Sequence, residues 1–177
     1  MGFHNPTGLK FLIMEKRKVC VVITARPSYS RIKTTLQAIK IHPDLELQIV
    51  LAGPALLNKY GNIENIIQDD GFTIAERVYT VLDGENLTSM AKTVGIGLVE
   101  LSNVFYQLKP HMVVVIADRF ETIAVSIAAA YQNIPLVHIP GVYQQTWYLH
   151  GVLFRQCYQL FRHLVCVPMV CFDKQRQ

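Results

Sequence analysis

Short runs of consecutive apolar residues alternate along the chain with longer stretches in which apolar residues recur every three or four positions. The runs have the length of strands and are rich in β-branched residues, as expected for strands covered on both faces of a parallel sheet. They predict strands at 19–23, 45–51, 74–82, 112–116 and 134–139. The stretches with helical spacing predict helices that include 32–39 and span 55–68, 87–108 and 120–131.

Predicted strands and helices follow one another in repeated units, which indicates an α/β fold. Such units predict a doubly wound parallel sheet with helices on both faces. Turn residues such as Gly53-Pro54 and Asp83-Gly84 separate the elements. Gly95 and Gly97 lie inside the predicted helix 87–108, where glycine is costly, so we expect this helix to pack closely on a neighbour.

The character of the chain changes after Ile139. The segment 140–177 holds three of the four cysteines and seven of the 17 aromatic residues, but only one of the 13 acidic residues. Its apolar residues form no single helical face. We therefore treat this segment as a tail that is separate from the α/β domain.

The composition is that of a folded protein with a hydrophobic core. Of the 177 residues, 51% are hydrophobic and 17% are charged, a balance that excludes extensive disorder. Basic residues outnumber acidic ones by 17 to 13, but they are scattered and form none of the dense runs of nucleic-acid-binding arms. We expect no nucleic-acid partner, and the mild basicity is compatible with an anionic small ligand.

Several other classes of protein are excluded by the patterns that are missing. No apolar run approaches the roughly 20 residues of a membrane helix, and residues 1–18 lack the order of a secretory signal, so we expect a cytoplasmic protein without a membrane anchor. The four cysteines include no Cys-x-x-Cys pair, and no His, Cys and carboxylate residues stand at ligand spacing. We therefore expect no metal site, no disulfide framework and no cofactor.

The loop after the first predicted strand contains the first candidate site. Ligands of open parallel sheets bind at the carboxyl ends of the strands. In this loop Arg26 offers a cationic fork, and Ser28 or Ser30 can cap the following helix while the backbone amides of the helix face an anion. The simpler alternative is a serine cap beside a solvated surface arginine, and the spacing alone favours it.

The second candidate site follows the most apolar strand, 112–116. Asp118 can act as an acid or base, and Arg119 beside it can position a diphosphate. Alternatively, Asp118 caps the next helix, with Glu121 completing a pattern that is similar to a capping box. Both interpretations remain open from the motif alone.

The third candidate is His138, which lies at the end of the last predicted strand. A histidine there can titrate near neutral pH. A histidine flanked by Val137 and Ile139 is more commonly a core residue with satisfied hydrogen bonds. We keep it as a candidate catalytic residue.

Seven short motifs between Lys18 and Ile139 then carry a resemblance to a known family. They are Arg26-Pro-Ser-Tyr-Ser30, His42-Pro-Asp-Leu-Glu-Leu47, Lys59-Tyr-Gly-Asn62, Ile67-Gln-Asp-Asp70, Asp83-Gly-Glu85, Leu108-Lys-Pro110 and Asp118-Arg119-Phe120. In this order and spacing, the chain resembles the hydrolysing UDP-N-acetylglucosamine 2-epimerases of the sialic-acid pathway. The resemblance implies one Rossmann-like half of a glycosyltransferase-B-like fold, in which a nucleotide sugar binds between two such halves.

The resemblance also implies an activity and a set of site residues. The family converts UDP-N-acetylglucosamine and water into N-acetylmannosamine and UDP, by eliminating UDP across C1–C2 and then adding water. By this resemblance, Arg26 and Ser30 contact the uridine diphosphate, Arg119 assists them, and Asp118 is a catalytic carboxylate. Family members often form dimers through this half, so a homodimer is an expected partner. A separate C-terminal half is another, since the chain is long enough for only one half.

Two departures from the family pattern limit what we expect of this chain. Pro140 stands where the family has a glutamate that takes part in proton handling, and the chain is long enough for only the first of the two halves. We therefore divide it into an N-terminal extension (1–17), a Rossmann-like domain (18–139) and a divergent tail (140–177). Little or no epimerase activity is expected from the chain alone. The alternatives are a non-catalytic nucleotide-binding or interaction fragment and, last, a flavodoxin-like domain of unrelated function.

Overall fold

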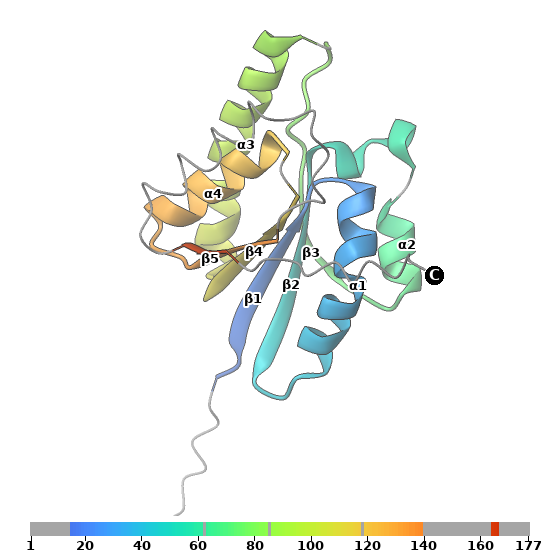
Figure 1. The fold of residues 1–177 in the computed structure, drawn as a ribbon, viewed down its shortest axis with the longest axis vertical. Helices are drawn as coiled ribbons and strands as arrows, with labels where there is room; N and C mark the ends of the chain where they lie inside the picture. Colours follow the sequence, from blue (N-terminus) through green and yellow to red (C-terminus); the bar gives the residue numbers. More distant parts are fainter. Residues whose placement is uncertain (1–14, 62, 85, 118, 140–163, 167–177) are drawn as a thin grey trace, which may run out of the picture.

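A computed structural model describes residues 15–139, except 62, 85 and 118, together with 164–166 (Figure 1). Within these residues, six parallel strands form one sheet in the order β3-β2-β1-β4-β5-β6. The strands are β1 (Arg17–Ile23), β2 (Leu45–Ala52), β3 (Ile74–Val78), β4 (Met112–Ile116), β5 (Leu136–Ile139) and β6 (Leu164–Cys166). From β1 the chain adds β2 and β3 on one side, and then β4, β5 and β6 on the other. The strand order therefore reverses between β1 and β4, as in a Rossmann-like sheet.

Helices cover both faces of this sheet, which confirms the predicted fold class (Figure 1). The helices are α1 (Arg26–Ile41), α2 (Ile63–Asp69), α3 (Leu87–Leu108) and α4 (Glu121–Tyr131). Side chains alternate along each strand, so Val21 packs with α1 and α2 whereas Val22 packs with α3 and α4. Two buried apolar layers result, one on each side of the sheet. None of the helices in the described part of the chain is long and apolar enough to cross a membrane.

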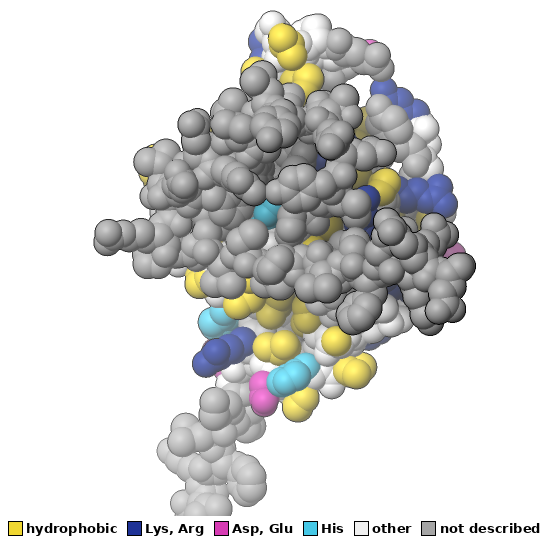
Figure 2. All heavy atoms as spheres, in the orientation of Figure 1, with side chains coloured by type: hydrophobic (Ala, Val, Ile, Leu, Met, Phe, Trp, Pro, Cys, Tyr) yellow, Lys and Arg dark blue, Asp and Glu magenta, His cyan; other side chains and the backbone are white. Residues whose placement is uncertain are grey.

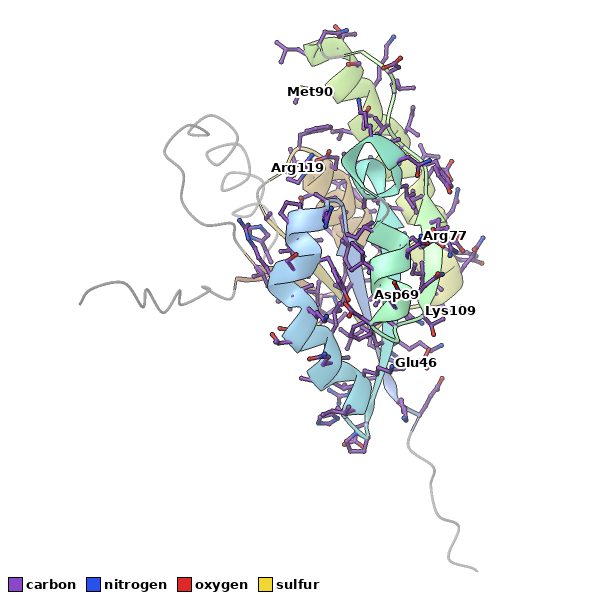
Figure 3. All side chains as sticks on the ribbon, turned by 90° about the vertical axis from the view of Figure 1, so that its right-hand side faces the viewer. Glu46, Asp69, Arg77, Met90, Lys109 and Arg119 are labelled. Atoms are coloured by element: carbon purple, nitrogen blue, oxygen red, sulfur yellow. The ribbon has the colours of Figure 1, made fainter. Side chains whose placement is uncertain are left out.

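Helix α3 has the bounds that the sequence predicts, and both of its ends have a local cause. At its start, Asn86 and Ser89 form a reciprocal capping box. At its end, Lys109 adopts a left-handed conformation (φ 48°) immediately before Pro110, which cannot continue a helix. The first turns of α3 extend beyond the carboxyl edge of the sheet, where Figure 3 places Met90.

The two glycines of α3 differ in what surrounds them. A Cβ atom on Gly97 would lie 3.2 Å from the Cβ of Ala124 in α4, so the expected close packing is confirmed at this position. A Cβ atom on Gly95 would meet no described atom within 4 Å. The expectation of close packing was therefore wrong for Gly95.

The predicted helix 55–68 is wrong. Two short 3-10 turns, η1 (Gly53–Leu56) and η2 (Asn58–Tyr60), precede the short helix α2. Pro54 lies in the first turn, and Gly61 at φ 88° redirects the chain before α2 begins. Strand β3 is also shorter than the predicted 74–82, because Val78 pairs with Ala52, the last residue of β2, and no strand continues beyond it.

Candidate functional site

Two loops that the sequence singles out lie side by side at the carboxyl edge of the sheet. Strands β1 and β4 are neighbours, with Val22 paired to Val115, so the chain leaves both strands at the same edge. Arg26 follows β1 and Arg119 follows β4. Figure 3 shows Arg119 at the end of the molecule where α1 begins. This position, where the strand order reverses, is the usual ligand site of doubly wound sheets.

Arg26 is exposed and is the first residue of α1. A Cβ atom on Gly61 would lie 2.9 Å from its Nη1 atom, so the guanidinium group packs against the backbone of Gly61. Ser30 is also exposed, one helical turn further along the same face. The turn after η2 therefore supports Arg26 from the side, and the φ of 88° at residue 61 favours glycine there.

The expected serine cap of α1 is wrong. The residue in the N-cap position is Ala25, which has no side chain to cap the helix, and Ser28 and Ser30 lie inside the helix. Pro27 in the first turn explains the early start, because its fixed φ is already helical and it has no amide hydrogen to satisfy. Helix α1 carries four basic residues and no acidic ones. Figure 2 shows lysine and arginine side chains on the side of the molecule where Figure 1 places α1 and α2.

Arg119 is held by Glu121 rather than standing free. Its Nε donates a hydrogen bond to Oε2 of Glu121 (3.2 Å), and its Nη2 donates one to Oε1 (3.0 Å). The Glu121 side chain is 6% exposed and the Arg119 side chain 38% exposed. Phe120, which precedes α4, has no side-chain cap and is itself in a helical conformation, so a cap formed by Asp118 and Glu121 stays a prediction. Asp118 lies outside the described residues, so its catalytic role stays a prediction.

The turn between β4 and α4 contains a strained backbone position. Ala117 has φ 69°, a left-handed conformation that costs an alanine about 1–2 kcal/mol. Its amide donates to the Ile139 carbonyl (2.9 Å), and its carbonyl accepts from the Thr122 hydroxyl (3.3 Å). Strain of this kind is concentrated at functional sites, because neighbouring contacts must enforce it. Here the contacts come from β5 and α4.

A narrow pocket lies behind Arg119, between the sheet and the helices α3 and α4. Glu121 and three threonines line it together with apolar residues of the sheet and both helices, and the surface that faces the pocket is almost wholly apolar. The lining residues are Thr24, Ala52, Thr80, Thr93, Gly97, Leu101, Glu121, Ala124 and Val125. Thr24 is 3% exposed, and its hydroxyl has no hydrogen-bond partner among the described residues.

His138 is on β5, paired with Val115 of β4, and is 4% exposed. This burial favours the interpretation as a core histidine, and its catalytic role stays a prediction. Cys20 is buried in β1, and burial raises the pKa of its thiol to about 12, so it is no nucleophile at neutral pH. Among residues 15–139 and 164–166, leaving out the three gaps, no three His, Cys, Asp or Glu side chains are grouped to hold a metal ion.

Sequence reasoning missed two features of this site. It treated Glu121 only as a capping residue, and it gave Gly61 no role. Arg119 and Glu121 are two positions apart, and this spacing alone does not show that their side chains pair. They pair because α4 begins at Glu121, so that the carboxylate turns back towards Arg119. The contact between Gly61 and Arg26 joins two connections that are far apart in the sequence, and no local pattern predicts it.

Known proteins of similar sequence point to one family. The family model for UDP-N-acetylglucosamine 2-epimerase matches residues 37–145, more than half of the chain. A GDP/UDP-N,N'-diacetylbacillosamine 2-epimerase (hydrolyzing) from Campylobacter jejuni is 31% identical over 128 residues, which are 72% of this chain and 33% of that protein. Polysialic acid biosynthesis protein P7 from Escherichia coli is 30% identical over 125 residues, 71% of this chain and 32% of that protein.

Solved structures show the same fold. A crystal structure of a UDP-N-acetylglucosamine 2-epimerase superposes with a TM-score of 0.68 at 19% identity, over 83% of this chain and 40% of that one. The UDP-GlcNAc 2-epimerase from Neisseria meningitidis, solved with bound UDP-GlcNAc, gives a TM-score of 0.61 at 20% identity, over 76% of this chain and 34% of that one. The chain thus spans about a third of the length of the curated relatives it matches.

Proposed function

The chain belongs to the UDP-N-acetylglucosamine 2-epimerase family, and we propose that its Rossmann-like domain forms the N-terminal half of the nucleotide-sugar site of a hydrolysing 2-epimerase. The whole protein would convert UDP-N-acetylglucosamine and water into N-acetylmannosamine and UDP. One observation carries the proposal. Arg26 and Arg119 follow two neighbouring strands at the point where the strand order reverses, so two cationic groups stand at the edge where this fold binds ligands.

The proposed chemistry gives each candidate residue a task. Arg26, Ser30 and Arg119 bind the diphosphate and support its departure as UDP leaves C1. Asp118 is a catalytic carboxylate for the proton transfer at C2, since elimination across C1–C2 needs a base for that proton. Water then adds to the glycal-type intermediate. The excess of basic residues on α1 adds a positive field that favours an anionic substrate.

For the 177-residue chain alone we expect little or no turnover. In a glycosyltransferase-B-like fold the second half closes the cleft, excludes water and adds donors to the diphosphate. Each donor lost from such a site costs about 3 kcal/mol of transition-state stabilisation, roughly a hundredfold in rate. Binding of UDP is therefore a sharper test of this domain than turnover.

The test is a calorimetric titration of the purified chain with UDP. We expect saturable binding by the wild type and a loss of about tenfold or more in affinity for Arg26→Ala, because hydrogen bonds to a charged group are lost. Arg31→Ala is the matched control, since it removes the same charge from an exposed position of α1. A folded wild type that binds no UDP, or equal affinities of all three proteins, would contradict the proposal.

A second candidate function is a non-catalytic fragment that binds a nucleotide. It is favoured by Pro140, which stands where the family has a glutamate. An NMR assay for N-acetylmannosamine separates the two functions when the chain is mixed with a separately expressed C-terminal half of the Neisseria meningitidis UDP-N-acetylglucosamine 2-epimerase, with UDP-N-acetylglucosamine as substrate. Product formation that disappears with Asp118→Asn supports the epimerase, whereas UDP binding without any product supports the fragment.

A further inference from the structure

Glu121 is a charged side chain at the ligand-binding edge that the proposed chemistry does not use. The residue is 5% exposed, although burying a carboxylate is unfavourable unless it is paired. Both of its oxygens accept hydrogen bonds from Arg119 (3.0 and 3.2 Å). The pair therefore satisfies the carboxylate and orients the guanidinium group at the same time.

The geometry of the pair decides which donors of Arg119 remain. A planar guanidinium has five N–H groups, and Glu121 takes one on Nε and one on Nη2. The other three, including both on Nη1, point away from the carboxylate. The Arg119 side chain is 38% exposed, so its pairing with Glu121 leaves part of it open to solvent.

Glu121 itself is fixed by its surroundings. It is the first residue of α4, where the helix dipole stabilises a carboxylate. Gly53, the first residue of η1, lies close to the glutamate, since a Cβ atom there would be 3.7 Å from Cγ of Glu121 and 3.5 Å from the Thr80 hydroxyl oxygen. The start of α4 and the close approach of η1 thus limit the positions that the Glu121 side chain can adopt.

We propose that Glu121 is a positioning residue, which fixes Arg119 so that its free edge binds the diphosphate of a nucleotide. The inference rests on the proposed function, because that function supplies the anion. Its prediction for the affinity of a Glu121 variant for the diphosphate has the opposite sign to the prediction from charge alone. Removing a negative charge near a diphosphate should tighten its binding, whereas losing a positioning residue should weaken it.

The first test is a UDP titration of wild type, Glu121→Gln, Arg119→Ala and the double variant. We expect Glu121→Gln to weaken UDP binding about fivefold or more, and to have no further effect when Arg119 is already alanine. Glu100→Gln is the control, since it removes one negative charge from an exposed position of α3. Unchanged or tighter binding by Glu121→Gln would overturn the inference and leave the proposed function standing, whereas a wild type without UDP binding overturns the proposed function.

Two further measurements apply even if Glu121→Gln folds poorly. Arg119→Lys keeps the charge but not the two-pronged pairing, so we expect a loss of UDP affinity close to that of Arg119→Ala. Affinity equal to wild type would overturn the inference. In the free wild-type chain, the ¹H–¹⁵N signal of Arg119 Nε should be resolved from those of solvated arginines, because this group is hydrogen-bonded. A signal at the solvated position contradicts the inference without any ligand.

Discussion

The phenolic hydroxyl of Tyr29 donates a hydrogen bond to the Asp70 carboxylate, with 2.5 Å between the two oxygens. Tyr29 is in α1, and Asp70 directly follows α2. The ammonium group of Lys33 donates to the other carboxylate oxygen (2.6 Å). The bond from Lys33 and then that from Tyr29 lower the pKa of Asp70 below its usual value, while burial and the same carboxylate raise the pKa of Tyr29. This cluster ties together the two helices on one face of the sheet.

The Asp70 cluster predicts a pH dependence of stability. Because the pKa of Asp70 is lower in the folded state, its contribution is complete above the unfolded pKa of about 4 and is lost as the pH falls through the lower folded value. We expect Asp70→Asn to lower the free energy of unfolding at pH 7, and the difference from wild type to shrink below about pH 4. Urea unfolding between pH 3 and pH 7 measures both. Asp69→Asn, an exposed neighbour, should show neither effect.

The two glycines of α3 predict opposite effects on stability. Gly95→Ala should stabilise the protein by about 1 kcal/mol, because alanine is the better helix former and nothing described lies within 4 Å. Gly97→Leu should destabilise it by about 1–3 kcal/mol, since the side chain would be forced against Ala124. Thermal unfolding of both variants is the measurement. Equal shifts in Tm would refute this account of the packing between α3 and α4.

The left-handed Ala117 makes an unusual prediction for a glycine substitution. Ala117→Gly removes about 1–2 kcal/mol of backbone strain and adds a smaller entropy cost in the unfolded chain, so the free energy of unfolding should rise slightly or stay constant. Ala38→Gly, at an exposed position inside α1, should lower it by about 1 kcal/mol. Denaturant unfolding compares the two. A loss at residue 117 as large as that at residue 38 would mean that Ala117 is not strained.

Cys20 predicts a thiol that is inert in the folded protein. Burial raises its pKa to about 12, so almost none is thiolate at pH 8. We expect iodoacetamide to modify Cys20 only when the chain is unfolded, as read by mass spectrometry of the peptide that contains it. Rapid modification under native conditions would show that β1 opens easily.

The sequence predicts those elements whose pattern and boundaries are both local. For α3, helical spacing, an N-terminal cap and a following proline all lie within the segment, and the predicted bounds are those observed. For 55–68, the apolar residues suggest one helix, but the backbone at Pro54 and Gly61 interrupts it. The helix propensities of residues 55–68, added together, do not reveal this interruption.

The candidate site follows the same rule. The positions of Arg26 and Arg119 at the carboxyl edge follow from strand prediction alone, because every parallel strand ends there. The pairing of Arg119 with Glu121 does not, since it depends on the residue at which α4 begins. Even so, the side chain that sequence reasoning treated as a helix cap is the one that orients the arginine.

The position of β1 in the sheet has a consequence for the folding of the protein during its synthesis on the ribosome. Lys18 and His111, where β1 meets β4, are 93 positions apart in the chain. At translation rates of about 5–20 residues per second, β4 is made roughly 5–20 s after β1. Throughout that interval one edge of β1 has no strand beside it and exposes unpaired backbone groups. The central pair of strands, β1 and β4, therefore cannot form until β4 has been synthesised, whatever the order in which the other strands pair.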